Sequence, residues 1–222
     1  MSTFATPGAR LARDDDDRIS IVLPGDWARI PLEGEEAANA EIARLLRAQI
    51  PRRDELATMR HETREMLRGI ARDARKSDAT LLAMSLELLP GVPFAAALLV
   101  HYIDIPHPEL DLPLEVRLAS AVPAGEVLEL TSGLAGRESG ISEPGPENPD
   151  AMTTIHYHYV IPTPFPGRWA KIYVNVPTTA DPELIGELFD AIIGTIRWYP
   201  DADPAQAADA APPMGSAPHS GA

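Results

Sequence analysis

The 222-residue chain contains no cysteine, only two lysines and no long apolar run. Without cysteine the chain has no disulfide framework, no thiol nucleophile and no thiolate metal site. The two lysines, Lys76 and Lys171, stand against many arginines and alanines, a composition typical of a high-GC bacterial genome. The longest apolar run, residues 94–100, fits a buried strand and falls far short of the ~20 residues that span a bilayer.

Basic residues are also outnumbered by acidic ones, 19 against 33, so the chain carries a formal net charge of -14 at pH 7. This acidity argues against a general nucleic-acid binder, since neutralising phosphates requires a positive surface. The first 18 residues lack the apolar segment of roughly 7–15 residues that a secretory signal requires, so we expect a cytoplasmic protein. With 45% hydrophobic residues, the chain is long enough for one well-packed core.

The two ends of the chain differ in composition from its middle. Residues 1–17 finish in four consecutive aspartates, a run of like charge that favours a solvated, disordered segment. Residues 200–222 are rich in alanine and proline and nearly devoid of large apolar side chains, which predicts a disordered tail. The sequence therefore predicts one folded domain over residues 18–199.

Hydrophobic periodicity in this domain changes from helical to alternating along the chain. Helical spacing predicts helices over residues 35–49, 54–76 and 181–193, and a short one over 114–121. In the second helix the expected inward set is Leu56, Met59, Thr63, Met66, Leu67, Ile70 and Ala74. Apolar and alternating runs predict strands over 18–23, 81–89, 94–105, 127–131, 134–141, 152–161 and 169–176. The sum is an α+β fold, an antiparallel sheet covered by helices.

Two segments, one at each end of the domain, form a recognisable pattern. The first strand runs into the turn "PGDW", which contains Pro24, Gly25 and Trp27. The last two long strands are followed by "DPELIGELFDAIIGTIRW", a helix and a short strand. Both features resemble PsbP-like domains, a superfamily that includes photosystem extrinsic subunits, a nuclear-import accessory factor and bacterial LpqN-type lipoproteins. The chain departs from these lipoproteins in having no lipidation cysteine. The resemblance implies an α/β/α sandwich of the LpqN-type bacterial branch and a non-enzymatic binding or assembly domain.

The segment "TIHYHYVI" places two histidines in an alternating run. Because side chains alternate along a strand, His156 and His158 share one face and Tyr157 and Tyr159 share the other. Two imidazoles about 6.6 Å apart at their α-carbons form a workable chelating pair, although a catalytic zinc site needs a third protein ligand. The alternative is a strand whose tyrosine face packs on a helix and whose histidine face is partly wet. His101 is the remaining histidine on a predicted strand, and nothing in the sequence places it beside the pair.

The other motifs give no catalytic or cofactor-binding signal. The segment "HETRE" has Glu65 where the zinc-protease motif needs its second histidine. Neither a G-x-S-x-G motif nor a phosphate-binding loop occurs, so the sequence predicts no catalytic residue and no cofactor. In "SGLAGRESG" we expect the glycines to make a turn and a bend. Arg137 and Glu138 in that segment are either a buried or a surface ion pair.

Basic residues recur every four positions along the second predicted helix. Like charges at this spacing repel by about 0.2–0.5 kcal/mol per pair, a cost that a solvated helix face tolerates. The functional alternative is a surface that binds an acidic partner or the acidic segments of the chain itself. The basic residues are Arg60, Arg64, Arg68, Arg72 and Lys76.

The function expected from these observations is that of a non-catalytic binding or accessory protein. It would hold a protein partner through the sheet face or the basic helix. One alternative is a metal-binding protein or metal-dependent enzyme that uses His156 and His158. A further alternative is a secretion- or assembly-linked accessory that is recognised through residues 200–222.

Overall fold

The structure, a computed structural model, describes residues 10–13, 18–49, 56–89, 92–105, 111–144, 152–178 and 180–199. Its strands are β1 (Arg10–Arg13), β2 (Ile19–Leu23), β3 (Asp26–Arg29), β4 (Ala79–Leu89), β5 (Val92–Asp104), β6 (Glu126–Leu130), β7 (Gly133–Ser142), β8 (Thr154–Pro162), β9 (Arg168–Pro177) and β10 (Arg197–Trp198). Its helices are α1 (Glu35–Gln49), α2 (Ala57–Lys76), α3 (Leu114–Ala121) and α4 (Pro182–Ile193). The expected tail, residues 200–222, lies outside the described residues.

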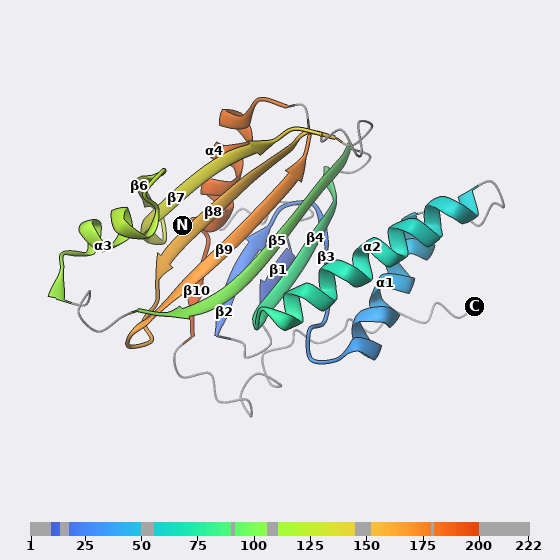
Figure 1. Ribbon diagram of the computed structural model, residues 1–222, viewed down its shortest axis with the longest axis horizontal. Helices are drawn as coiled ribbons and strands as arrows, with labels where there is room; N and C mark the ends of the chain where they lie inside the picture. The colour runs from blue at the N-terminus through green and yellow to red at the C-terminus, as the bar shows by residue number, and fades with distance from the viewer. Residues whose placement is uncertain are drawn as a thin grey trace, which may run out of the picture.

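The strands form two antiparallel sheets (Figure 1). A seven-stranded sheet has the order β3-β4-β5-β9-β8-β7-β6, and a three-stranded sheet has the order β1-β2-β10. Helices α1 and α2 cover one end of one face of the large sheet, and α3 covers the other end of the same face. Helix α4 and the small sheet lie on the opposite face. The predicted α+β fold, an antiparallel sheet covered by helices, is confirmed.

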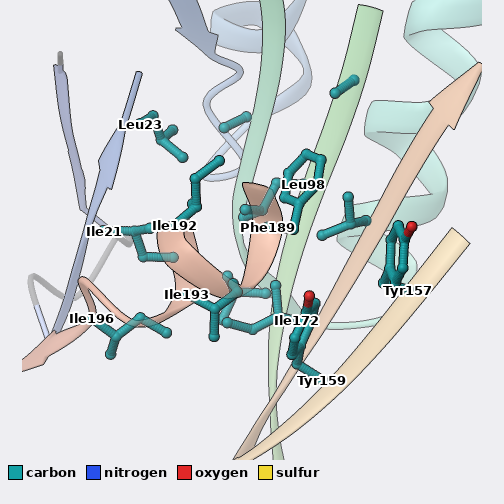
Figure 2. Packing of buried hydrophobic residues seen from close by; sticks show 14 of the residues in the cluster. Ile21, Leu23, Leu98, Tyr157, Tyr159, Ile172, Phe189, Ile192, Ile193 and Ile196 are labelled. Atoms are coloured by element: carbon teal, nitrogen blue, oxygen red, sulfur yellow. The ribbon is translucent and has the colours of Figure 1, made fainter. Parts of the chain in front are cut away.

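The main core lies between the large sheet, α4 and the small sheet (Figure 2). Alternate residues of β8 and β9 point into it, because successive side chains of a strand face opposite sides. Figure 2 shows Tyr157, Tyr159 and Ile172 from these strands on the same side as Phe189 and Ile192 of α4, all at most 3% exposed. Each such side chain contributes roughly 1.5–3 kcal/mol on burial, so this cluster holds α4 on the sheet.

Helix α4 begins at the position that the sequence predicts. Asp181 is its N-cap, and the Asp181 carboxylate accepts a hydrogen bond of 2.9 Å from the backbone N–H of Glu183. Pro182 occupies the first helical position, where its missing N–H leaves no hydrogen bond unmade. The Tyr157 hydroxyl donates to the Pro182 carbonyl oxygen, which ties the start of α4 to β8.

The "PGDW" turn carries the chain from the small sheet to the large one. Gly25 has a φ of 82°, and a Cβ there would lie 2.1 Å from the carbonyl oxygen of Glu87 in β4, so the turn requires glycine. Trp27 is buried in the main core, and its indole N–H donates a 2.8 Å hydrogen bond to the Pro24 carbonyl oxygen. The turn therefore buries a large ring where the two sheets meet.

On the face of the large sheet that α4 covers, an ion pair joins α4 to β7. Arg137 donates to Asp190 of α4 and to Glu126 of β6, each at 2.5 Å. The Tyr159 hydroxyl donates a 2.7 Å hydrogen bond to the other carboxylate oxygen of Asp190. Glu138 lies on the opposite face of β7, because neighbouring strand residues point to opposite sides. The sequence left open whether Arg137 and Glu138 form a buried or a surface ion pair. In the structure Arg137 pairs with Asp190 and Glu126 instead of with Glu138.

Two short strands differ from the sequence prediction. Strand β1 pairs with β2 and buries Ala12, so the domain includes residues from the segment 1–17 that the sequence predicted to be disordered. Strand β3 pairs with β4. Each has only four residues and owes its structure to the neighbouring strand, which a local pattern does not reveal. Residues 1–9 and 14–17 lie outside the described part of the chain.

Helix α2 buries only part of the predicted inward set, namely Leu67 and Ala74. Its buried residues are Leu67, Ala71 and Ala74, whereas Met59 and Met66 are 44% and 57% exposed. The inward prediction is therefore wrong for the two methionines. The helix packs beside α1 at one end of the sheet, and only a narrow stripe of α2 residues packs against α1 and the sheet. No helix of the described residues is long and apolar enough to cross a membrane.

Candidate functional site

The middle of the large sheet, on the face shared by α2 and α3, has polar and aromatic side chains. Strands β5, β9 and β8 form this part of the sheet and are uncovered between the two helices in Figure 1. Residues that pair directly across antiparallel strands lie on the same face. The paired rows across β5, β9, β8 and β7 are Leu99–Tyr173–His158–Glu138, Ala97–Asn175–His156–Gly140 and His101–Lys171–Val160–Gly136. Val160 and Gly136 of the last row are buried beside Leu118 and Val122 of the α3 region. We call the rest of these rows, with their strands, the open face.

Four rings form a continuous strip across the open face. His158 packs edge-on against Tyr173 with ring centroids 4.5 Å apart, and His101 packs edge-on against the same tyrosine at 5.4 Å. His156 follows at 6.0 Å from His158. All four rings are partly exposed, and edge-to-face packing stabilises aromatic groups in such an arrangement. The strip therefore presents preorganised planar surfaces to a partner.

A hollow of about 490 Å³ lies over β5 and β9, where α2 ends. Ser77, just after α2, places its carbonyl oxygen 2.9 Å from Nδ1 of His101. Because a carbonyl oxygen only accepts, the neutral His101 ring has its proton on Nδ1 and an acceptor at Nε2. The hollow is lined by Ser77, Leu99, His101, Tyr102, Ile103, Lys171, Tyr173 and Asn175.

Two glycines of β7 shape this face. A Cβ at Gly140 would lie 2.3 Å from Nε2 of His156, so the missing side chain leaves room for the ring. A Cβ at Gly136 would lie 2.9 Å from Val122, which follows α3. The sequence predicted a turn and a bend for the glycines of this segment. Only Gly133, with a φ of 120°, lies at a turn, and the other two allow close packing within the strand.

The predicted facing of "TIHYHYVI" agrees with the structure. Tyr157 and Tyr159 are buried in the main core, whereas His156 and His158 are partly exposed on the open face. His101 shares the open face but lies on β5, two strands from β8, which is about 10 Å at ordinary strand spacing. Tyr173 stands between His101 and His158, so His101 does not complete a three-histidine site.

The residues of the predicted basic helix do not form one continuous free surface. Arg68 donates to Asn39 of α1 at 3.0 Å and pairs with Glu65 at 2.8 Å. Arg60 and Arg64 are partly buried, and Arg72 is exposed. Lys76 is exposed at the end of α2, 3.6 Å from Asp73. The helix therefore uses part of its positive charge in its own contacts.

The environment of His158 shifts the titration of its imidazole. Burial is the main cause that lowers the pKa of the His158 imidazole, and the positive charges of His156 and Lys171 lower this pKa further. The carboxylate of Glu138 acts in the opposite direction. The neutral imidazole is therefore favoured in the folded protein.

We expect the free energy of unfolding to fall as the pH drops below about 6.5, the unperturbed histidine pKa. The unfolded chain takes up a proton on His158 that the folded chain resists, so stability rises with pH across this window. Urea denaturation at pH 7.5 and pH 5.5 measures the effect, which His158→Gln should reduce. His61→Gln, at an exposed position of α2, is the control and should keep the wild-type pH dependence. An unchanged dependence in His158→Gln would contradict the assignment.

Several residues of the site were not singled out from the sequence. Lys171, Tyr173 and Asn175 alternate with the buried residues of β9, so the period-two pattern of "WAKIYVNV" marked them as one face. Their position between the histidines of β5 and β8 depends on the strand order. Glu138 joins the site through its pairing with His158.

Comparisons with known proteins concern the fold. A scan against protein-family models finds no match, and neither does a search of the curated proteins. One similar solved structure is a Bacteroides thetaiotaomicron protein, with 8% identity, a TM-score of 0.46, and 89% of this chain and 51% of that chain covered. The chain thus spans about half the length of that protein. Another is cyanobacterial PsbP from Synechocystis sp. PCC 6803, with 9% identity, a TM-score of 0.34, and 90% of this chain and 97% of that chain covered. A PsbP protein is therefore among the distant structural neighbours of the chain.

Proposed function

We propose that this protein is a non-catalytic binding or accessory protein that holds its partner on the open face. The observation that supports this most directly is the strip of partly exposed rings beside a hollow of about 490 Å³. Binding sites commonly have volumes of about 300–1,000 Å³ and combine apolar walls with a few polar groups. Leu99, Tyr173, Lys171 and Asn175 supply that combination.

The chemistry of the open face suits binding. Its side chains offer planar rings, the ammonium group of Lys171, the amide of Asn175 and the carboxylate of Glu138, which orient a partner through packing and hydrogen bonds. Part of this proposal is that the chain belongs to the LpqN-type bacterial branch of PsbP-like domains, on the basis of its "PGDW" turn and closing helix. The proposed compartment is the bacterial cytoplasm.

Photo-crosslinking from the open face tests this function. A photoreactive phenylalanine replaces Asn175, which is exposed, and the protein is irradiated in an extract of its source cells. We expect a discrete crosslinked species that disappears when Tyr173 is also changed to alanine, with circular dichroism confirming the fold. The same group at Arg72, on the exposed side of α2, is the control. Equal crosslinking from both positions, or none from position 175, would contradict the proposal.

Metal binding by His156 and His158 is the second candidate, and it is favoured by their placement on one face with ring centroids 6.0 Å apart. In the part of the chain that the structure describes, no group of three His, Cys, Asp or Glu side chains is placed to hold a metal ion. Stable zinc sites have at least three protein ligands. The pair alone is therefore a weak chelator.

We expect purified protein to carry only background zinc. Elemental analysis by mass spectrometry should give the same low metal content for the wild type and for the double variant His156→Ala with His158→Ala. The variant His61→Ala, on α2, is the matched control. Near-stoichiometric metal that the double variant loses would favour the metal candidate over the binding protein.

A further inference from the structure

The hollow over β5 and β9 is bounded along β5 by both helical layers. Leu99 packs against the cluster of α1 and α2, whereas Ile103, on the same face of the strand, packs against the cluster of α3. These two residues are ~13 Å apart along the strand at about 3.3 Å per residue, and their own side chains fill part of that span. His101 lies midway between them and lines the hollow. The opening therefore suits single side chains and is too narrow for a further helix, which is about 10–12 Å across.

Three polar side chains of the hollow offer hydrogen-bond donors to a partner. Among the described residues, the Lys171 ammonium has no ion pair, and the Tyr173 hydroxyl and the Asn175 amide have no hydrogen-bond partner. No carboxylate of the described residues lines the hollow, and Glu138 lies on β7, two strands from β9. The hollow therefore favours an anionic group, although the chain as a whole has a net charge of -14.

These three side chains follow one another on a single face of β9. Lys171, Tyr173 and Asn175 occupy alternate positions of the strand, so the α-carbons of neighbouring members are ~6.6 Å apart. The Tyr173 ring lies between the ammonium and the amide, and His158 and His101 pack edge-on against it at 4.5 Å and 5.4 Å. The order along the strand is thus donor, ring, donor. An extended segment of another chain has the same spacing, because its alternate side chains project to one side at ~6.6 Å intervals.

We infer that the hollow binds an extended segment of a partner protein in which an aromatic side chain is two positions from a carboxylate, an inference that rests on the proposed binding function. The aromatic ring packs on Tyr173 and Leu99, and the carboxylate accepts hydrogen bonds from the Lys171 ammonium. A second carboxylate, two positions away on the other side of the ring, accepts from the Asn175 amide. Pockets for alternate side chains give specificity in other complexes with extended peptides.

Short synthetic peptides test this inference. The probe is a fluorescently labelled peptide with the sequence Gly-Glu-Ser-Trp-Ser-Glu-Gly, which has a carboxylate two positions from the ring in either direction. One control peptide has glutamine in place of both glutamates, a second has lysine there, and a third has alanine in place of tryptophan. Fluorescence anisotropy at low salt should show the probe binding the full-length protein at least about tenfold more tightly than each control peptide.

Protein variants locate the binding. Lys171→Gln should weaken the probe by about tenfold and leave the glutamine peptide unchanged, because only the probe has a carboxylate for the ammonium to bind. Lys76→Gln makes the same change at the other lysine of the chain, which is exposed at the end of α2, and should alter the binding of neither peptide. Tyr173→Leu keeps an apolar side chain and should weaken both peptides, because both carry the tryptophan ring. Circular dichroism confirms that each variant is folded.

Equal binding of the probe and the glutamine peptide, or binding that is insensitive to Lys171→Gln, would overturn the inference. Binding of indole-3-propionate as tight as that of the probe would overturn it as well, because the hollow would then be a site for a free aromatic acid. If no peptide binds but crosslinking from position 175 still captures a partner, the inference about the segment fails and the proposed function stands. If both experiments fail, the open face is not a binding site.

Discussion

Replacing Trp27 with alanine is expected to lower the free energy of unfolding by about 3–5 kcal/mol. The ring is only 4% exposed and lies in the main core with Leu23 and Ala83. Its removal leaves a cavity where the small sheet meets the large one, beside the turn in which Gly25 lies against the backbone of β4. Urea denaturation at neutral pH, followed by circular dichroism, measures the loss.

A conservative variant separates the ring from its hydrogen bond. Trp27→Phe keeps most of the apolar area and loses the indole N–H that donates to Pro24, so it should cost clearly less than Trp27→Ala. Met66→Ala, at an exposed site, controls for the method and should stay within about 0.5 kcal/mol of wild type. A Trp27→Ala denaturation midpoint close to that of the wild type would show that the ring does not stabilise the core.

The second large effect is expected for Tyr159→Ala, with a loss of about 3–5 kcal/mol. Tyr159 is fully buried, and its hydroxyl donates to Asp190, which also binds Arg137. The substitution therefore removes a large ring and one hydrogen bond of a partly buried carboxylate. The double variant His156→Ala with His158→Ala removes partly exposed rings and should cost less than Tyr159→Ala. The same urea titration compares the variants.

Tyr159→Phe isolates the hydroxyl group in this comparison. Hydrogen bonds to charged groups contribute about 1.5–3 kcal/mol, so Tyr159→Phe should lie between wild type and Tyr159→Ala. Burial and the Asp190 carboxylate raise the pKa of the Tyr159 hydroxyl above its ordinary value of 10, so this contribution to stability is complete below pH 10 and decreases progressively as the pH rises above 10. A double histidine variant less stable than Tyr159→Ala would contradict the assignment of faces in β8.

Sequence patterns sufficed for elements whose signals are local. The bounds of α1 follow from the spacing of Ile42, Leu45 and Leu46, and the start of α4 follows from the Asp181 cap and Pro182. Strand β1 could not be predicted, because its four residues bury little apolar area and depend on pairing with β2. Local patterns reveal neither such pairing nor strand order.

In the candidate site, too, local patterns predict which face a side chain is on but not which strands are neighbours. Alternation in β8 was enough to put both histidines opposite the tyrosines. The strand order places β9 between β5 and β8 and so brings Tyr173 between His101 and His158. The exposure of Met59 and Met66 depends on where α1 packs against α2, which helical periodicity alone does not specify.

The two lysines of the chain allow the most direct test of the open face. Lys171 lies on the open face, and Lys76 is exposed on the basic helix, the other surface predicted to bind a partner. The protein is acetylated alone and after recovery in complex with its partner from source-cell extract, and mass spectrometry quantifies acetylation at each lysine. The proposed function predicts that the partner protects Lys171 and leaves Lys76 reactive. Protection of Lys76 with Lys171 still reactive would contradict it and would assign the partner to the basic helix.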